Sequence, residues 1–158
     1  MSATAQRLHG PRIILLEDSQ ILSEILKLCI LSWFCDADVI SFENGDAAWV
    51  ALSRLEPDLL ITDRIHPGLT GEELVWRLAE RQVQFPILML SGDVTATMNP
   101  PSDLKLVCLS KPFNRDSLWR VLNELVGPCD FPAYPLEPGH QPSLRRFQKD
   151  GKPFTSRS

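Results

Sequence analysis

Short apolar runs alternate with longer amphipathic segments along most of the chain, and this alternation limits the fold more than any other feature. The runs are five or six residues long and rich in Ile, Leu and Val, which is typical of strands. Parallel strands need crossover helices, so the pattern predicts an α/β fold with a parallel sheet covered on both faces. The predicted strands are residues 12–16, 37–42, 57–62, 86–90 and 104–109, and the predicted helices are residues 19–33, 44–55, 70–82 and 114–126.

The segment after the fourth predicted strand departs from this pattern. Asn99 is followed by Pro100 and Pro101, and proline cannot continue the interior of a helix. We therefore expect a five-stranded sheet whose fourth helix is shortened.

A different texture begins at Gly127. Six prolines fall in residues 127–158, where apolar residues are few. Such a segment cannot bury enough apolar surface to offset the entropy of ordering it, so we expect it to be extended or flexible. We divide the chain into an N-terminal extension (1–10), one domain (11–126) and a Pro-rich tail (127–158).

The charge of the chain is unevenly distributed. The net charge is −4 overall, but residues 1–126 carry 11 Lys and Arg against 17 Asp and Glu. An acidic body of this kind argues against a nucleic-acid-binding face.

The cysteines and the apolar runs indicate a cytoplasmic protein. Cys29, Cys35, Cys108 and Cys129 form no CxxC pair and have no His at zinc-ligand spacing, which favours reduced thiols. The N-terminus lacks an apolar leader, and no apolar run approaches the roughly 20 residues needed to cross a bilayer. We therefore expect no metal bound by cysteine and no membrane insertion.

Polar side chains follow four of the predicted strands at the point where each strand ends. Glu17 and Asp18 come directly after the first strand, and Asp63 follows the third. Ser91 follows the fourth strand, and Lys111 lies just past the fifth. The carboxyl ends of parallel strands meet at one edge of a sheet, which is where ligands bind in open α/β folds. We expect these five side chains to lie close together.

Their chemistry suits phosphoryl transfer. Clustered carboxylates repel one another, and a hard divalent cation with oxygen ligands, here Mg²⁺, offsets that repulsion. Lys111 can neutralise phosphoryl oxygens, Ser91 can donate a hydrogen bond, and a carboxylate can act as nucleophile. Asp63 is the best candidate nucleophile because its strand is expected to be central.

Four stretches of the sequence carry these residues: LLEDS, LLITDRIHPGLTGEEL, LMLSGD and SKPF. In this order, at these strand ends, they resemble the signature regions of the response-regulator receiver family of two-component signalling. The resemblance covers residues 11–126. It implies a flavodoxin-like, doubly wound (βα)5 receiver fold, here with the shortened fourth helix.

The resemblance also implies the metal ligands. Glu17 and Asp18 match the acidic pair that holds Mg²⁺, with Asp18 the direct ligand. Asp63 matches the phosphoacceptor and a further ligand, and the backbone carbonyl of Ile65 matches the third protein ligand.

The other matched residues belong to the phosphoryl site. Ser91 matches the switch hydroxyl and Lys111 the phosphate-binding lysine, and members of the family often have a cis bond such as the one we expect between Lys111 and Pro112. We predict a stand-alone response regulator and not an enzyme. It would accept phosphate on Asp63 from a histidine kinase or histidine phosphotransfer protein in a phosphorelay. It would signal by contact with a downstream protein and bind no nucleic acid.

Two other functions remain open at this point, and so does the extent of the protein. The fold can serve as a docking module that phosphorylation hardly affects, or as a metal-dependent phosphatase. We expect a complete short chain, with a fragment of a larger hybrid kinase as the alternative. Taken singly, Asp18 can cap the first helix, Lys111 can be a surface lysine and Ser91 a turn residue.

Four residues around the site need separate comment. Cys108 stands where the family usually has an aromatic residue that moves on phosphorylation. Arg64 adds a cation directly after Asp63, and its role is open. Ile65 occupies a position that orients the hydrolytic water in the family, and its side chain cannot form a hydrogen bond. We interpret His66 as a partly exposed loop residue and not a ligand.

Overall fold

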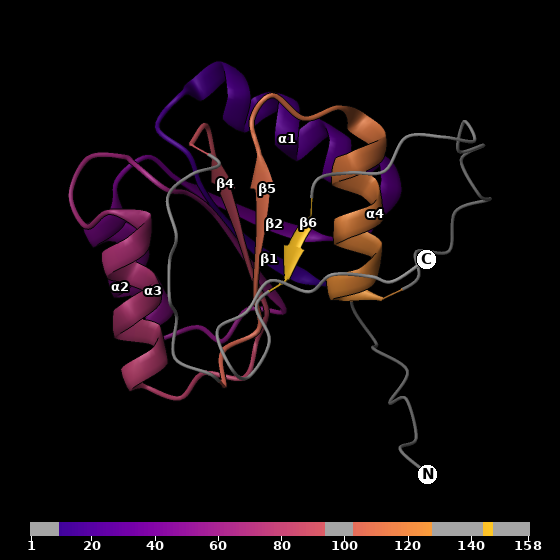
Figure 1. Cartoon of the computed structure of the whole chain (residues 1–158). Helices are drawn as coiled ribbons and strands as arrows, with labels where there is room; N and C mark the ends of the chain where they lie inside the picture. Colours follow the sequence, from indigo (N-terminus) through magenta and orange to yellow (C-terminus); the bar gives the residue numbers. More distant parts are fainter. Residues whose placement is uncertain (1–9, 94–102, 128–143, 147–158) are drawn as a thin grey trace, which may run out of the picture.

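The computed structural model describes residues 10–93, 103–127 and 144–146 of the chain (Figure 1). Five parallel strands form the centre of the sheet, in the order β2-β1-β3-β4-β5. Strand β3 is therefore central, as we expected for the strand that ends in Asp63. The five strands are β1 (Arg12–Leu16), β2 (Asp38–Phe42), β3 (Leu59–Asp63), β4 (Ile87–Ser91) and β5 (Leu106–Ser110).

Each of the four described helices begins at a polar residue whose side chain accepts a backbone N–H of the first turn, which satisfies a donor that has no partner within the helix. Asn114 is the N-cap of α4, as the sequence predicts. Ser19 is the N-cap of α1, so the alternative in which Asp18 caps this helix is wrong. The helices are α1 (Gln20–Trp33), α2 (Gly45–Leu52), α3 (Gly71–Glu80) and α4 (Arg115–Val126).

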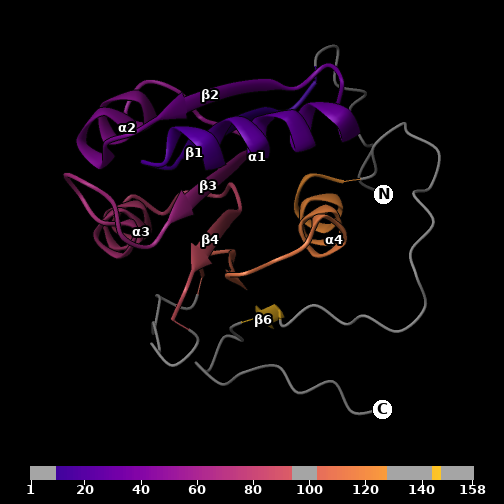
Figure 2. The same ribbon diagram turned by 90° about the horizontal axis from the view of Figure 1, so that it is seen from above.

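The helices cover the two faces of the sheet in pairs. Figure 2 shows α1 and α4 on one face and α2 and α3 on the other. Successive side chains of a strand point to opposite faces, so Ile13 and Leu15 pack in the cluster under α1 and α4. Ile14 and Leu16 pack under α2 and α3. The polar strand ends are thereby confined to the edge between these two apolar layers.

The predicted fold class is confirmed. The first predicted strand has the observed bounds, and no bound of the other four differs from the observed one by more than two residues. The shortened fourth helix was predicted for a segment that lies mainly in residues 94–102, outside the described residues. Among the described residues, no helix is long and apolar enough to cross a membrane.

The Pro-rich tail contributes a strand that the sequence reasoning missed. Strand β6 (Leu144–Arg146) pairs antiparallel with Val107–Leu109 of β5. It extends the sheet to six strands, of which the five predicted ones are parallel and β6 is antiparallel. The segment is too short to show an alternating pattern, and it pairs because the outer edge of β5 offers unpaired backbone groups.

We expect a chain truncated after Gly127 to fold, because both buried clusters lie within residues 13–126. Loss of the short strand β6 should lower the melting temperature by about 5 °C or less. Thermal unfolding followed by circular dichroism measures this change. A truncated chain without a cooperative transition would show that the tail is part of the core domain.

Candidate functional site

The five predicted site residues lie together at the carboxyl ends of the strands. Asp63 and Ser91 are the last residues of β3 and β4. Glu17 and Asp18 follow β1, and Lys111 follows β5. The backbone N–H of Lys111 donates to the carbonyl oxygen of Ser91 at 2.7 Å, which ties the ends of the two neighbouring strands together.

Lys111 is the central cation of the site. Its Nζ lies 2.9 Å from Asp63 Oδ2 and 3.4 Å from Glu17 Oε2. The remaining oxygen of each carboxylate accepts a backbone N–H: Asp63 Oδ1 from Arg64 at 2.7 Å and Glu17 Oε1 from Ser19 at 3.1 Å. Asp63 is therefore oriented on both sides before any ligand binds.

Burial and local contacts shift the pKa values of two site residues. The side chain of Glu17 is only 2 % exposed, and this burial raises the pKa of its carboxyl group, while Ser19 and Lys111 act in the opposite direction. Burial alone would lower the pKa of Lys111, but its contacts with Asp63 and Glu17 outweigh burial and raise it. Lys111 therefore stays an ammonium ion at neutral pH.

The acidic residues are placed to share one cation. Carboxylate oxygens of Glu17, Asp18 and Asp63 all lie within 4.8 Å of one another. Oxygen donors of this kind suit Mg²⁺, which prefers carboxylates and water. The set contains three negative charges and Lys111 supplies one positive charge, so a divalent ion would bring the total to zero.

Ser91 is buried and its hydroxyl is engaged. Its Oγ donates to the carbonyl oxygen of Asp93 and accepts the N–H of Asp93, both at 3.1 Å. These are the local bonds of a turn, as the simpler interpretation of Ser91 anticipated. The bond between Lys111 and Pro112 is cis, as predicted.

Arg64, whose role the sequence left open, forms ion pairs on two sides. Its guanidinium contacts Glu72 Oε1 through Nε and a terminal nitrogen, both at 2.6 Å. Its other terminal nitrogen lies 3.7 Å from Asp93 Oδ2. A loop separates Arg64 from Glu72 in the sequence, so no periodic pattern predicts that these two residues pair.

The interpretation of His66 as partly exposed is wrong. His66 is buried, and its Nε2 lies 3.2 Å from the hydroxyl of Thr62. The loop after β3 folds against the start of α2, where Gly45 N–H donates to the carbonyl oxygen of Pro67 at 3.0 Å. This packing covers the imidazole, while the side chain of Ile65 is exposed.

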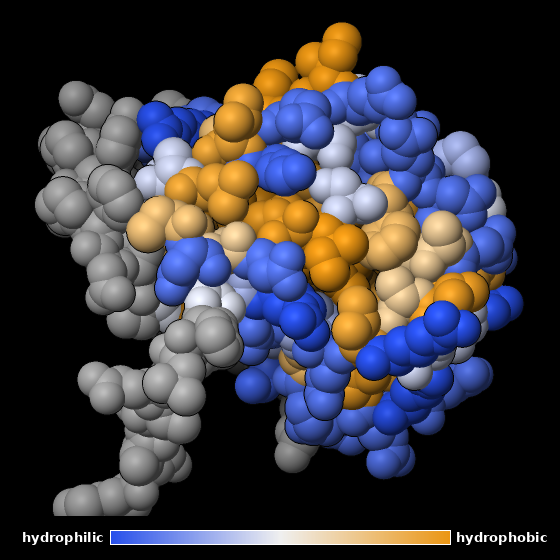
Figure 3. Space-filling model, turned by 180° about the vertical axis from the view of Figure 1, so that it is seen from behind, coloured by the Kyte–Doolittle hydropathy of each residue, from blue (hydrophilic) through white to orange (hydrophobic). Residues whose placement is uncertain are grey.

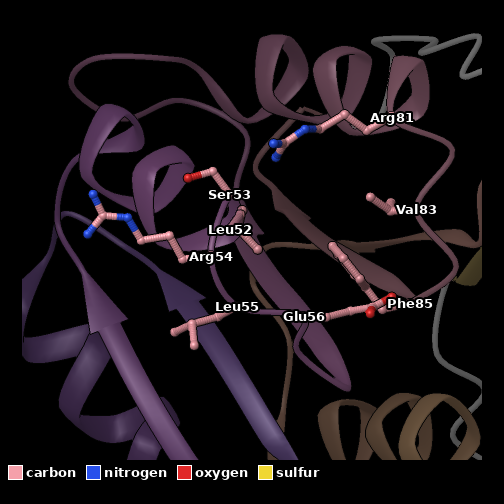
Figure 4. A pocket seen from close by; sticks show the side chains of 8 residues that line it. All are labelled: Leu52, Ser53, Arg54, Leu55, Glu56, Arg81, Val83 and Phe85. Atoms are coloured by element: carbon pink, nitrogen blue, oxygen red, sulfur yellow. The ribbon is translucent and has the colours of Figure 1, made fainter.

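A separate hollow of about 300 Å³ lies near the amino ends of the strands (Figure 4). It is lined by residues that precede β3 and β4, whereas the acidic cluster follows β1 and β3. Leu52 and Phe85 are buried and form its apolar part, and Arg54, Glu56 and Arg81 are exposed beside it. The hollow is therefore not part of the acidic site.

Comparison with known proteins agrees with this geometry. The sequence profile of the response regulator receiver domain matches residues 13–123. The chain belongs to this receiver family. The receiver is 29 % identical to the response regulator receiver protein CpdR of Brucella abortus over 117 residues, which are 73 % of this chain and 96 % of CpdR.

Other relatives are longer proteins. The receiver is 30 % identical to the transcriptional regulatory protein TcrA of Mycobacterium tuberculosis over 84 % of this chain, but it spans only 53 % of TcrA.

Among solved structures, the receiver domain of a sensor histidine kinase from Pseudomonas aeruginosa superposes with a TM-score of 0.63 and 22 % identity. That match covers 74 % of this chain and 98 % of the other, whose active-site cleft coordinates a magnesium ion.

We expect Glu17→Gln to stabilise the protein at neutral pH, because the ionised carboxylate pays the cost of burial and the amide does not. Burial raises the folded pKa of Glu17 above 4.5, so the folded protein takes up a proton before the unfolded chain as the pH falls. The advantage of the variant should therefore shrink as the pH falls toward 4.5.

Denaturant unfolding at a series of pH values measures this difference. Glu80→Gln, at an exposed position at the end of α3, is the matched control. If the difference in free energy of unfolding between Glu17→Gln and the wild type stays constant over this pH range, the raised pKa of Glu17 is contradicted.

Proposed function

We propose that this receiver is a phosphoacceptor in two-component or phosphorelay signalling, phosphorylated on Asp63 with Mg²⁺. The observation that carries the proposal is the 2.9 Å contact between Lys111 Nζ and Asp63 Oδ2 beside the carboxylates of Glu17 and Asp18. A lysine that contacts the nucleophilic carboxylate can also bind an oxygen of a phosphoryl group that is attached to this carboxylate.

Each residue has a defined part in the proposed reaction. When bound, Mg²⁺ would neutralise phosphoryl oxygens, held by Asp18, Asp63, the backbone carbonyl of Ile65 and, through its charge, Glu17. A carboxylate oxygen of Asp63 attacks phosphorus, and the bond from phosphorus to the donor imidazole nitrogen breaks. The electron pair stays with the imidazole, which takes up a proton. Lys111 and the hydroxyl of Ser91 then bind oxygens of the transferred group.

The phosphoryl group would remain on Asp63 as the signal. We therefore propose a signalling module and not an enzyme that turns over small phosphoesters. Receiver domains interact with histidine kinases, and we propose a histidine kinase or histidine phosphotransfer protein as the donor. We further propose a downstream protein as the target, no contact with nucleic acid, and a cytoplasmic location, where ATP supplies phosphohistidine donors.

A docking module that responds little to phosphate is a second candidate. Cys108 lies in β5, and its side chain packs against the cluster under α2 and α3. A thiol is too small to exchange between two packed positions as a large aromatic ring can. The first experiment below separates the two candidates.

Incubation with acetyl phosphate and Mg²⁺ should add the mass of one phosphoryl group to the wild-type protein. Asp63→Asn should show no gain, because an amide is not a nucleophile for this transfer. Asp18→Ala should also lose the gain while the protein stays folded, because removal of one clustered carboxylate relieves repulsion. Intact-mass spectrometry measures the gain, and its absence in the wild type would favour the docking module.

The donor surface that we propose lies on α1, directly after the acidic pair. Ile21, Ile25 and Leu28 recur at helical spacing and are all exposed. Figure 3 shows apolar side chains gathered on the side of the molecule where α1 and β2 lie. Such an exposed apolar stripe is typical of a protein contact, and its place next to Asp18 would bring a donor histidine to the site.

Ile25→Glu should slow phosphotransfer from a phosphohistidine donor protein by about tenfold or more, because it places a charge in the contact. Labelling by acetyl phosphate should not change, because this small donor needs no docking surface. Val50→Glu on α2 is the control, since Val50 and Ile25 are each 51 % exposed. Equal slowing in both variants would exclude α1 as the specific donor surface.

A further inference from the structure

Arg64 is held in place by both its backbone and its side chain. Its N–H donates to Asp63 Oδ1 at 2.7 Å and to the carbonyl oxygen of Leu90 at 3.0 Å. Its carbonyl oxygen accepts the N–H of Gly71 at 2.9 Å, and Gly71 has no Cβ because one would overlap the carbonyl oxygen of Asp63. The guanidinium is fixed on the first turn of α3 by Glu72, and the side chain of Arg64 is only 22 % exposed.

The free side of this fixed guanidinium faces Asp93. The distance from the Arg64 terminal nitrogen to Asp93 Oδ2 is 3.7 Å, which is an ion pair without a close hydrogen bond. The side chain of Asp93 is 58 % exposed. The pair is therefore loose and can exchange between made and broken states more easily than the pair with Glu72.

Asp93 in turn holds the hydroxyl of Ser91. A hydroxyl has one hydrogen to donate, and Ser91 donates it to the carbonyl oxygen of Asp93. To bind a phosphoryl oxygen on Asp63, Ser91 has to give up this bond. Any contact that fixes Asp93 in its present position therefore opposes the rearrangement of Ser91.

We propose that Arg64 is a positioning residue which, through its ion pair with Asp93, holds the turn of Ser91 in the unphosphorylated arrangement. The contact sets how readily the Ser91 hydroxyl becomes available to a phosphoryl group. The inference rests on the proposed function of Asp63, and it assigns to this chain a control of the hydroxyl that does not require an aromatic ring at Cys108.

The ion pair limits the size of the effect. Exposed pairs contribute little to stability, so loss of this one should change the equilibrium by about two- to fivefold. The direction of the change in affinity for a phosphoryl mimic is a sharper test than its size. Loss of a residue that holds Ser91 away should strengthen binding of a phosphoryl mimic, whereas loss of a residue that itself contacts the phosphoryl group should weaken binding.

The first measurement needs no metal. Amide hydrogen exchange of Asp93, whose N–H is bonded to Ser91 Oγ, is followed by NMR in the metal-free protein. Arg64→Met should raise the exchange rate about two- to fivefold. Arg64→Lys should restore part of the protection, because the charge remains but the planar fork is lost. Unchanged exchange in Arg64→Met would overturn the proposal.

The second measurement is the affinity for beryllofluoride with Mg²⁺, followed by titration. Arg64→Met should bind about two- to fivefold tighter than the wild type. Asp93→Asn should behave in the same way, and the double variant should gain nothing more than either single one, since both changes break the same contact. Equal or weaker binding by Arg64→Met would overturn the proposal.

The control is Arg77→Met, which removes an arginine of α3 that stacks elsewhere. The Cζ atom of Arg77 lies 5.5 Å from the centroid of the Trp49 ring. Neither measurement should change in this variant. A wild-type protein that does not bind beryllofluoride at all would contradict the proposed function of the site. The exchange rate of the Asp93 amide still decides in that case whether Arg64 holds the turn.

Discussion

The ion pair between Lys111 and Asp63 is the interaction on which the arrangement of the site depends. It joins residues 48 positions apart at 2.9 Å, at an edge where two further carboxylates lie close by. Without the ammonium, three carboxylates would face one another in a partly buried site, which is costly. Glu17 illustrates that cost, because burial raises its pKa despite the contact with Lys111.

The architecture of the sheet explains why this charge lies where it does. The central strand β3 is covered on both faces, and its residues from Leu59 to Thr62 are buried. Asp63, its last residue, is the first that emerges from between the two apolar layers. The neighbouring strands β1 and β4 end within one residue of the position paired with Asp63, so the polar residues at the strand ends gather at one place beside the apolar layers.

The gathering of the five candidate side chains was predictable from the sequence, but their immediate surroundings were not. Glu17, Asp18, Asp63, Ser91 and Lys111 could be placed because each follows an apolar run whose length marks a strand. His66 and Arg64 lie in the loop after β3, where no periodicity indicates which way a side chain points. The burial of His66 comes from packing of this loop against α2, and the partners of Arg64 come from α3 and from the turn after β4.

The sequence by itself determined the type and order of the elements and the identity of the residues at the strand ends, because hydrophobic periodicity is a local property of the chain. Tertiary structure decided which atoms meet. The order of strands brings Lys111 to Asp63 and Glu17, and the free edge of β5 receives β6. Contacts of this kind depend on the distances between elements far apart in the chain, and a local pattern contains no measure of those distances.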